Sequence, residues 1–141
     1  MSRQRARTKG RTSDGQFAGI PKECMDHPGY IELTYKAKVL LFEFARQYNG
    51  FNNGDLVLTW KLLKPRGWSS KRTIQKARDE LQQSGWIVTT RPGARNQCQL
   101  YAVTYKPIDE CKGKHDAAPT RTPLAFWRQR SNPWLIDSKA A

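Results

Sequence analysis

Cysteine is scarce in this sequence and is not spaced as a disulfide framework or a compact metal site requires. Three cysteines stand among 141 residues, and no two are separated by only two others. Because three thiols cannot all pair with one another, we expect no disulfide scaffold and a reducing compartment. No apolar run approaches the ~18 residues of a membrane span, and no apolar signal-peptide region follows the basic stretch from Arg3 to Arg11. These absences predict a soluble intracellular protein.

The residue patterns of catalysis are also missing. No Ser-His-Asp or Cys-His arrangement has the spacing of a known motif, and no Gly-rich loop of the Walker or dinucleotide-binding type occurs. The carboxylates are few and scattered. The sequence therefore predicts a protein that is not an enzyme and that needs no cofactor.

Acidic residues are outnumbered. Lys and Arg total 25 against 12 Asp and Glu, which gives a net charge of +13. Such a balance indicates a polyanionic partner, with nucleic acid first and an acidic membrane surface second. The hydrophobic share is 38%, below the ~45–50% of typical globular chains (a measure that also counts Gly), so part of the chain is expected to pack no core.

The length fits one domain with tails, since domains commonly run ~100–150 residues. We expect a flexible basic arm over residues 1–28, a folded domain over 29–108 and a partly docked tail over 109–141. The arm has no apolar period. It serves either as a solubilising tail or as an arm that clamps DNA phosphates or enters the minor groove. Its alternating basic residues are Arg3, Arg5, Arg7, Lys9 and Arg11.

The first long helix is predicted between an N-cap at Thr34 and a stop at Gly50. One apolar face forms the core stripe, and its residues are Leu33, Ala37, Leu40, Leu41, Phe44 and Tyr48. Tyr35, Val39 and Phe42 recur at i, i+4 and i+7 on the opposite face. This second stripe packs on the C-terminal tail, forms a dimer seam or stays partly exposed, and the sequence leaves the three alternatives open.

The stretch from Thr59 to Tyr105 has the element order of a winged helix-turn-helix. After a short strand at 56–58, Thr59 caps a short helix that ends at Pro65 and Gly67. Ser69 or Ser70 then caps a longer helix that Gly85 stops. Two strands, 86–90 and 98–105, flank a hairpin loop at 92–97. The expected fold is α+β, with three helices and a β-hairpin wing.

The longer helix at 69–85 is the predicted recognition helix. Ile74, Ala77 and Leu81 form its packed face, beside the aliphatic stem of Arg78. A polar opposite face usually means solvation, with acids in the first turn and bases in the last, as the helix dipole favours. Here the basic residues lie in the N-terminal half. This placement favours binding of an anion, with the N-terminal half in the DNA major groove.

Candidate DNA contacts divide into two roles. Arg and Lys suit guanine edges and Gln suits adenine edges, so base readout is assigned to Arg72, Gln75, Lys76 and Gln83. Backbone contacts position the protein without specifying sequence. They are assigned to Lys61, Lys64, Arg66, Ser69, Lys71, Arg91 and Arg95. The hairpin is alternatively a purely structural element.

The tail after Pro107 contains two aromatic clusters, Leu124-Phe126-Trp127 and Trp134-Leu135-Ile136. Its prolines argue against a long helix, and disordered tails usually lack such aromatics. We therefore expect one or both clusters to dock, either on the stripe Tyr35, Val39, Phe42 or on a partner protein.

Three stretches of the chain share a recognisable pattern. They read LTYKAKVLLFEFARQYNGFNNGDL, RGWSSKRTIQKARDELQQSGWI and LYAVTYKPIDECKGKHD. Together they resemble, over roughly residues 16–127, a family of small winged helix-turn-helix proteins of bacterial prophages, plasmids and other mobile elements, mostly without assigned function. The resemblance implies that fold, DNA binding and no enzyme activity. Because replication initiators of plasmids and phages use similar domains, it does not separate a repressor from a replication accessory.

A zinc site is a further alternative, because Cys24 with His27 and Cys111 with His115 flank the expected domain. Finger-like sites usually keep their ligand pairs close in sequence, and the family commonly has an aliphatic residue at the position of His115. No metal is therefore the preferred expectation.

The combined expectation is a sequence-specific DNA-binding protein that regulates transcription in a phage or mobile element. It would act in the bacterial cytoplasm at the nucleoid, on double-stranded DNA, with a homodimer left open. The alternative is a replication-accessory or protein-interaction module that recruits a partner through the winged domain and the aromatic tail.

Overall fold

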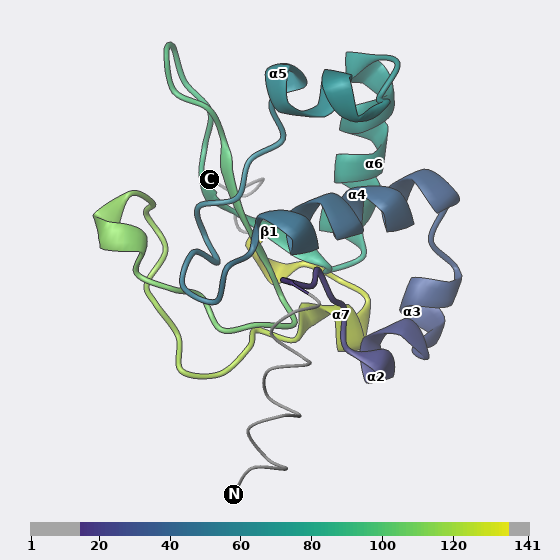
Figure 1. The fold of residues 1–141 in the computed structure, drawn as a ribbon. Coiled ribbons are helices and arrows are strands. Elements are labelled where there is room, and N and C mark those ends of the chain that lie inside the picture. The colour runs from purple at the N-terminus through teal and green to yellow at the C-terminus, as the bar shows by residue number, and fades with distance from the viewer. Residues whose placement is uncertain (1–14, 136–141) are drawn as a thin grey trace, which may run out of the picture.

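The chain folds as an α+β unit of several helices and one antiparallel hairpin, and the computed structural model describes residues 15–135 (Figure 1). Within that range, none of the helices combines the length and the apolar composition that a membrane span requires. The elements are α2 (Lys22–Met25), α3 (Pro28–Ile31), α4 (Tyr35–Gln47), α5 (Trp60–Leu63), η1 (Lys64–Arg66), α6 (Lys71–Gln83), β1 (Ile87–Arg91), β2 (Leu100–Val103), η2 (Cys111–Gly113) and α7 (Phe126–Gln129).

The predicted caps of the central helices are confirmed. A hydroxyl oxygen accepts a backbone N–H in the first turn of each helix: Thr34 in α4 at 3.2 Å, Thr59 in α5 at 3.3 Å and Ser70 in α6 at 3.1 Å. Each bond satisfies one of the free donors of a helix start. Gly67 ends η1 in a left-handed conformation, with φ of 99°, so the chain turns there between α5 and α6.

The hairpin pairs β1 with β2 in antiparallel register, and Ile87 lies opposite Val103. The strand expected at 56–58 is reduced to one bridge, in which Leu56 and Tyr101 exchange both backbone hydrogen bonds. The side chains of Tyr101 and Val103 belong to the main hydrophobic core, together with residues of the helices. Ala102 lies on the opposite face of the hairpin, in a second cluster with Val88 and Ile108. Tyr101 and Val103 therefore face the helices, and Ala102 faces the other side of the hairpin.

The main core lies between α4, α6 and the hairpin. Leu40, Leu41 and Phe44 of α4 are fully buried, and Phe44 meets the Tyr101 ring edge-on at 5.5 Å between centroids. At the start of α4, the carboxylate of Glu80 accepts the backbone N–H of Thr34 at 2.8 Å and its hydroxyl at 2.7 Å. Packing and these bonds together fix α6 against α4.

The folded part begins earlier than residue 29, where the sequence placed the start of the domain. Ile20, Cys24 and Tyr30 are buried in the main core. Helix α2 lies wholly before residue 29, and α3 spans it. Helices of four residues have no periodic signal, so the basic composition dominated the prediction. The arm residues Arg3, Arg5, Arg7, Lys9 and Arg11 lie outside the described residues.

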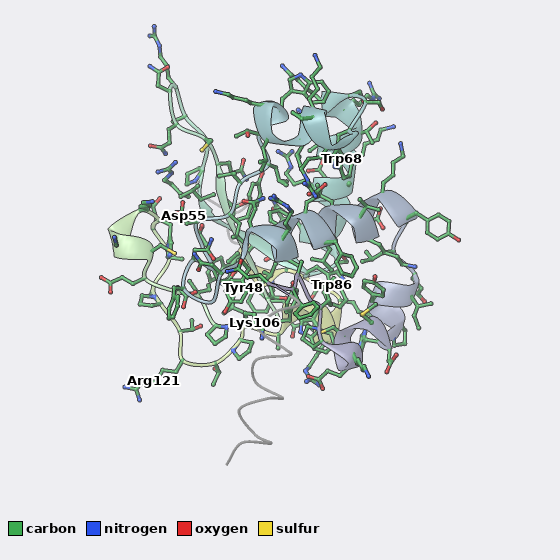
Figure 2. The ribbon with its side chains drawn as sticks, in the orientation of Figure 1. Tyr48, Asp55, Trp68, Trp86, Lys106 and Arg121 are labelled. Carbon is green, nitrogen blue, oxygen red and sulfur yellow. The ribbon has the colours of Figure 1, made fainter. Side chains whose placement is uncertain are left out.

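The tail docks, but not on the stripe Tyr35, Val39, Phe42. Trp127 is buried and stacks on the fully buried Trp86, with ring centroids 5.3 Å apart and planes 15° apart. Figure 2 shows Trp86 between α4 and α7. Leu124, Phe126 and Trp134 pack against the second cluster, which Val88, Ala102 and Ile108 form. Of the two docking sites that the sequence left open for the tail, the stripe is therefore excluded for the described part of the tail. Ile136 lies outside the described residues.

Candidate nucleic-acid interface

The N-terminal half of α6 presents a basic surface. Ile74, Ala77 and Leu81 are buried on one face of α6 and so orient the helix. The helical period then leaves the opposite face in solvent. The exposed side chains in this half are Lys71, Arg72, Gln75 and Lys76, preceded by exposed Ser69. Lys61 and Lys64 on the neighbouring short helices are exposed as well.

Arg66 has a different environment from the other residues that were predicted to contact the DNA backbone. Its Nε donates to Oε1 of Glu43 at 2.5 Å, and the indole Nε1 of Trp68 donates to Oε2 at 3.2 Å. The Glu43 carboxylate is buried, so it needs both partners to offset its lost hydration. Arg66 therefore ties the turn between η1 and α6 to α4, while its contact with a DNA phosphate stays a prediction.

The predicted readout residues do not form one cluster. Gln75 lines a hollow of about 280 Å³ between α5, α6 and the hairpin. Lys76 lies on another side, beside the start of α4, where it lines a second hollow with Thr34 and Tyr35. Gln83 is eleven positions after Arg72, which corresponds to ~16 Å along a helix. Arg72 and Gln75 thus lie in the N-terminal half of α6, whereas Gln83 lies at its C-terminal end.

Arg78 is a cationic residue of this surface that the sequence assigned only to packing. It is half-buried, lines the same hollow as Lys71 and Gln75, and donates to Oδ1 of Asp79 from Nε at 3.1 Å. Burial raises the pKa of the adjacent Tyr101 phenol, and a hydrogen bond from Arg78 acts in the opposite direction. The i, i+4, i+7 spacing of Lys71, Gln75 and Arg78 is the signal that could have identified this face.

The hairpin loop carries one free cation at its tip. Arg95 is exposed, and a turn closed by two backbone hydrogen bonds between Ala94 and Gln97 holds the loop. Arg91 is instead half-buried, and its guanidinium donates to the carbonyl of Cys98 at 2.7 Å and that of Lys114 at 3.3 Å. Arg95 is placed as predicted, whereas Arg91 braces the hairpin.

The two Cys-His pairs do not converge on a metal site. In the region 15–135, no three His, Cys, Asp or Glu side chains gather where they could hold an ion. His27 accepts the N–H of Gly29, and His115 is buried against Asp109 and Ala117. The thiols of Cys24 and Cys111 are desolvated by burial, which raises the pKa of each to about 11. The pairs lie at separate sides of the fold, near α2 and near η2 (Figure 1).

Comparisons with protein-family models, curated proteins and solved structures find no match. The function is therefore inferred from the geometry and charge of the residues above.

Proposed function

We propose that the chain is a winged helix-turn-helix protein that binds double-stranded DNA, with α6 in the major groove and the hairpin loop on the backbone. The order of α4, the Leu56 bridge, α5, α6 and the hairpin is the order that this fold requires. It supports the assignment of α5 and α6 as the two helices of the motif and of the β1–β2 loop as the wing.

The observation that carries the proposal is the placement of the free cations. Lys61, Lys71, Arg72 and Arg95 are exposed, and α5 and the hairpin tip project toward the same end of the molecule (Figure 1). A duplex laid across that end would meet cations from the helices and from the wing. Arg121 projects from a loop at the opposite end (Figure 2), which makes it a control position.

The first experiment is a selection of bound sites from random duplex DNA, with the full chain at near-physiological salt. We expect a recovered motif, whose symmetry and half-site spacing report whether two copies bind. Enrichment without a motif would favour the alternative, a replication-accessory role with non-specific binding. No enrichment at all would contradict DNA binding.

Arg72→Ala and Lys61→Ala separate the two proposed roles. On the selected site Arg72→Ala should weaken binding by about 1–3 kcal/mol and relax the sequence preference, because a base contact is lost. Lys61→Ala should weaken selected and random DNA alike and flatten the dependence of affinity on salt, because a phosphate contact is lost.

These affinities are measured by fluorescence anisotropy at several salt concentrations, with Arg121→Ala as the matched loss of an exposed cation. Equal losses on both kinds of DNA for Arg72→Ala and Lys61→Ala would refute the division of roles. A loss of the same size for Arg121→Ala would mean that net charge alone drives binding.

We further propose that the DNA-binding protein is a transcription regulator of a phage or other mobile element, working in the bacterial cytoplasm. The resemblance of residues 16–127 to small winged proteins of such elements supports this setting. The alternative, recruitment of a protein by the aromatic tail, is weakened because Phe126, Trp127 and Trp134 pack within the fold.

A further inference from the structure

The stripe Tyr35, Val39, Phe42, here called the α4 stripe, is an apolar surface in solvent. Its side chains are 83%, 51% and 37% exposed. Across residues 15–135 no segment covers them, since the aromatic residues of the tail pack on Trp86 and on the second cluster. Large apolar side chains in a row at helical spacing mark an interaction surface more often than isolated ones do.

Two hollows lie in the surface beside the α4 stripe. A groove of about 230 Å³ separates α4 from the turn before α6, with Tyr35 and Val39 on one wall and Trp68 on the other. A second hollow, of about 570 Å³, lies between the start of α4 and α6. Tyr35 lines both, so it forms a ridge between two depressions. The stripe spans ~10 Å, which matches about two turns of a partner helix laid along it.

The charge around the stripe selects the kind of partner. Lys36, Lys38 and Arg46 are the cations of α4, and its one acid, Glu43, is buried and paired with Arg66. The ammonium of Lys38 lies 5.4 Å from the centroid of the Tyr35 ring. Two copies facing each other through this stripe would bring like charges together, which opposes self-association. Residues 1–14 are strongly basic and are an unsuitable occupant for the same reason.

We propose that the α4 stripe binds an acidic amphipathic helix of another protein. Leucine-like side chains of that helix fill the groove beside Tyr35 and Val39, and its carboxylates face the lysines of α4. The proposal does not rest on DNA binding, because none of the three stripe residues is a proposed DNA contact, although Ser69 and Lys76 line the adjoining hollows.

The test starts with a display library of helix-forming peptides selected on the full chain. Enriched peptides are expected to carry apolar residues at i, i+4 and i+7 and acidic residues elsewhere. Their dissociation constants are then measured with the wild type and with Tyr35→Ala/Val39→Ser. This double variant keeps the net charge and changes exposed side chains, so we expect an unchanged fold by circular dichroism and at least tenfold weaker binding.

Two controls separate the stripe from other surfaces. Phe51→Ala removes an aromatic side chain that is 81% exposed outside the stripe, and Lys71→Ala/Arg72→Ala removes charge from α6. Both should leave peptide affinity within about threefold of the wild type. Enrichment of peptides without acidic residues, or equal binding by the stripe variant, would overturn the proposal. So would a dimer in sedimentation that the stripe variant dissociates, because the occupant would then be a second copy.

Discussion

At the residue scale, the Glu43 carboxylate is the clearest case of a buried charge that depends on its neighbours. Arg66 and Trp68 supply its two hydrogen bonds. Arg66→Ala removes the charged partner and leaves a buried carboxylate with one bond. We expect the free energy of unfolding to fall by about 1–3 kcal/mol, measured by urea denaturation.

Lys61→Ala is the control for that substitution, because it removes a neighbouring exposed cation. Its effect on the free energy of unfolding should stay within about 0.5 kcal/mol. Equal effects of the two variants would mean that the bond from Arg66 to Glu43 stabilises the fold no more than an exposed cation does.

The three cysteines should differ in reactivity because their burial differs. Cys98 is exposed, Cys111 is partly buried and Cys24 is buried. With a thiol reagent at pH 8, we expect Cys98 to react fast, Cys111 more slowly and Cys24 last, since the thiolate is the reacting form. Cys98→Ser should remove only the fast phase. Three equally fast thiols would contradict the described packing.

Burial of the Cys24 and Cys111 thiols also determines whether the free energy of unfolding rises or falls with pH. The pKa of Cys24 and that of Cys111 rise from 9.0 to about 11 in the folded chain. Below pH 9 both states hold the proton, so the stabilising preference for the neutral thiol is fully present. Between pH 9 and 11 the unfolded chain loses the proton first. The contribution of these thiols to the free energy of unfolding therefore falls across that range.

At the element scale, two glycines that each follow a helix should differ in how well they tolerate substitution by alanine. Gly67 and Gly85 have φ of 99° and 86°, so alanine costs about 1–2 kcal/mol at each. A Cβ at Gly67 would meet nothing within 4 Å, whereas at Gly85 it would lie 2.5 Å from the carbonyl oxygen of Phe126. We expect Gly85→Ala to cost a further ~1–3 kcal/mol in urea denaturation, because the backbone of the tail must shift. Equal losses would place the tail farther from α6 than described.

What the sequence could predict depends on whether an element has a local signal. The caps at Thr34 and Thr59, a cap at Ser69 or Ser70, and the inward positions of α6 follow from residue type and spacing, and they were predicted. The pairing of Arg66 with Glu43, 23 positions apart, has no local signal. The stacking of Trp127 on Trp86 likewise depends on the tail returning to the domain. The face of Lys71, Gln75 and Arg78 was missed because Arg78 was considered only for its aliphatic stem.

At the scale of the whole molecule, Trp127 joins the two ends of the described chain. It stacks on Trp86, meets the His27 ring edge-on at 5.2 Å, and its neighbour Arg128 reaches Glu23 of α2 at 3.3 Å. The N-terminal helices α2 and α3 pack against the core partly through this contact. Their stability should therefore depend on a residue about a hundred positions away in sequence.

Trp127→Ala removes a buried indole, and such changes cost about 3–5 kcal/mol. We expect hydrogen exchange to accelerate first in α2 and α3, because they lose a packing partner, while α4 and α6 keep protection as long as the domain stays folded. Trp127→Phe keeps an aromatic ring and should give a smaller change in the same amides. If exchange in α2 and α3 were unchanged in the alanine variant, the N-terminal helices would be held by α4 and Trp86 alone, and the coupling between the two ends would be refuted.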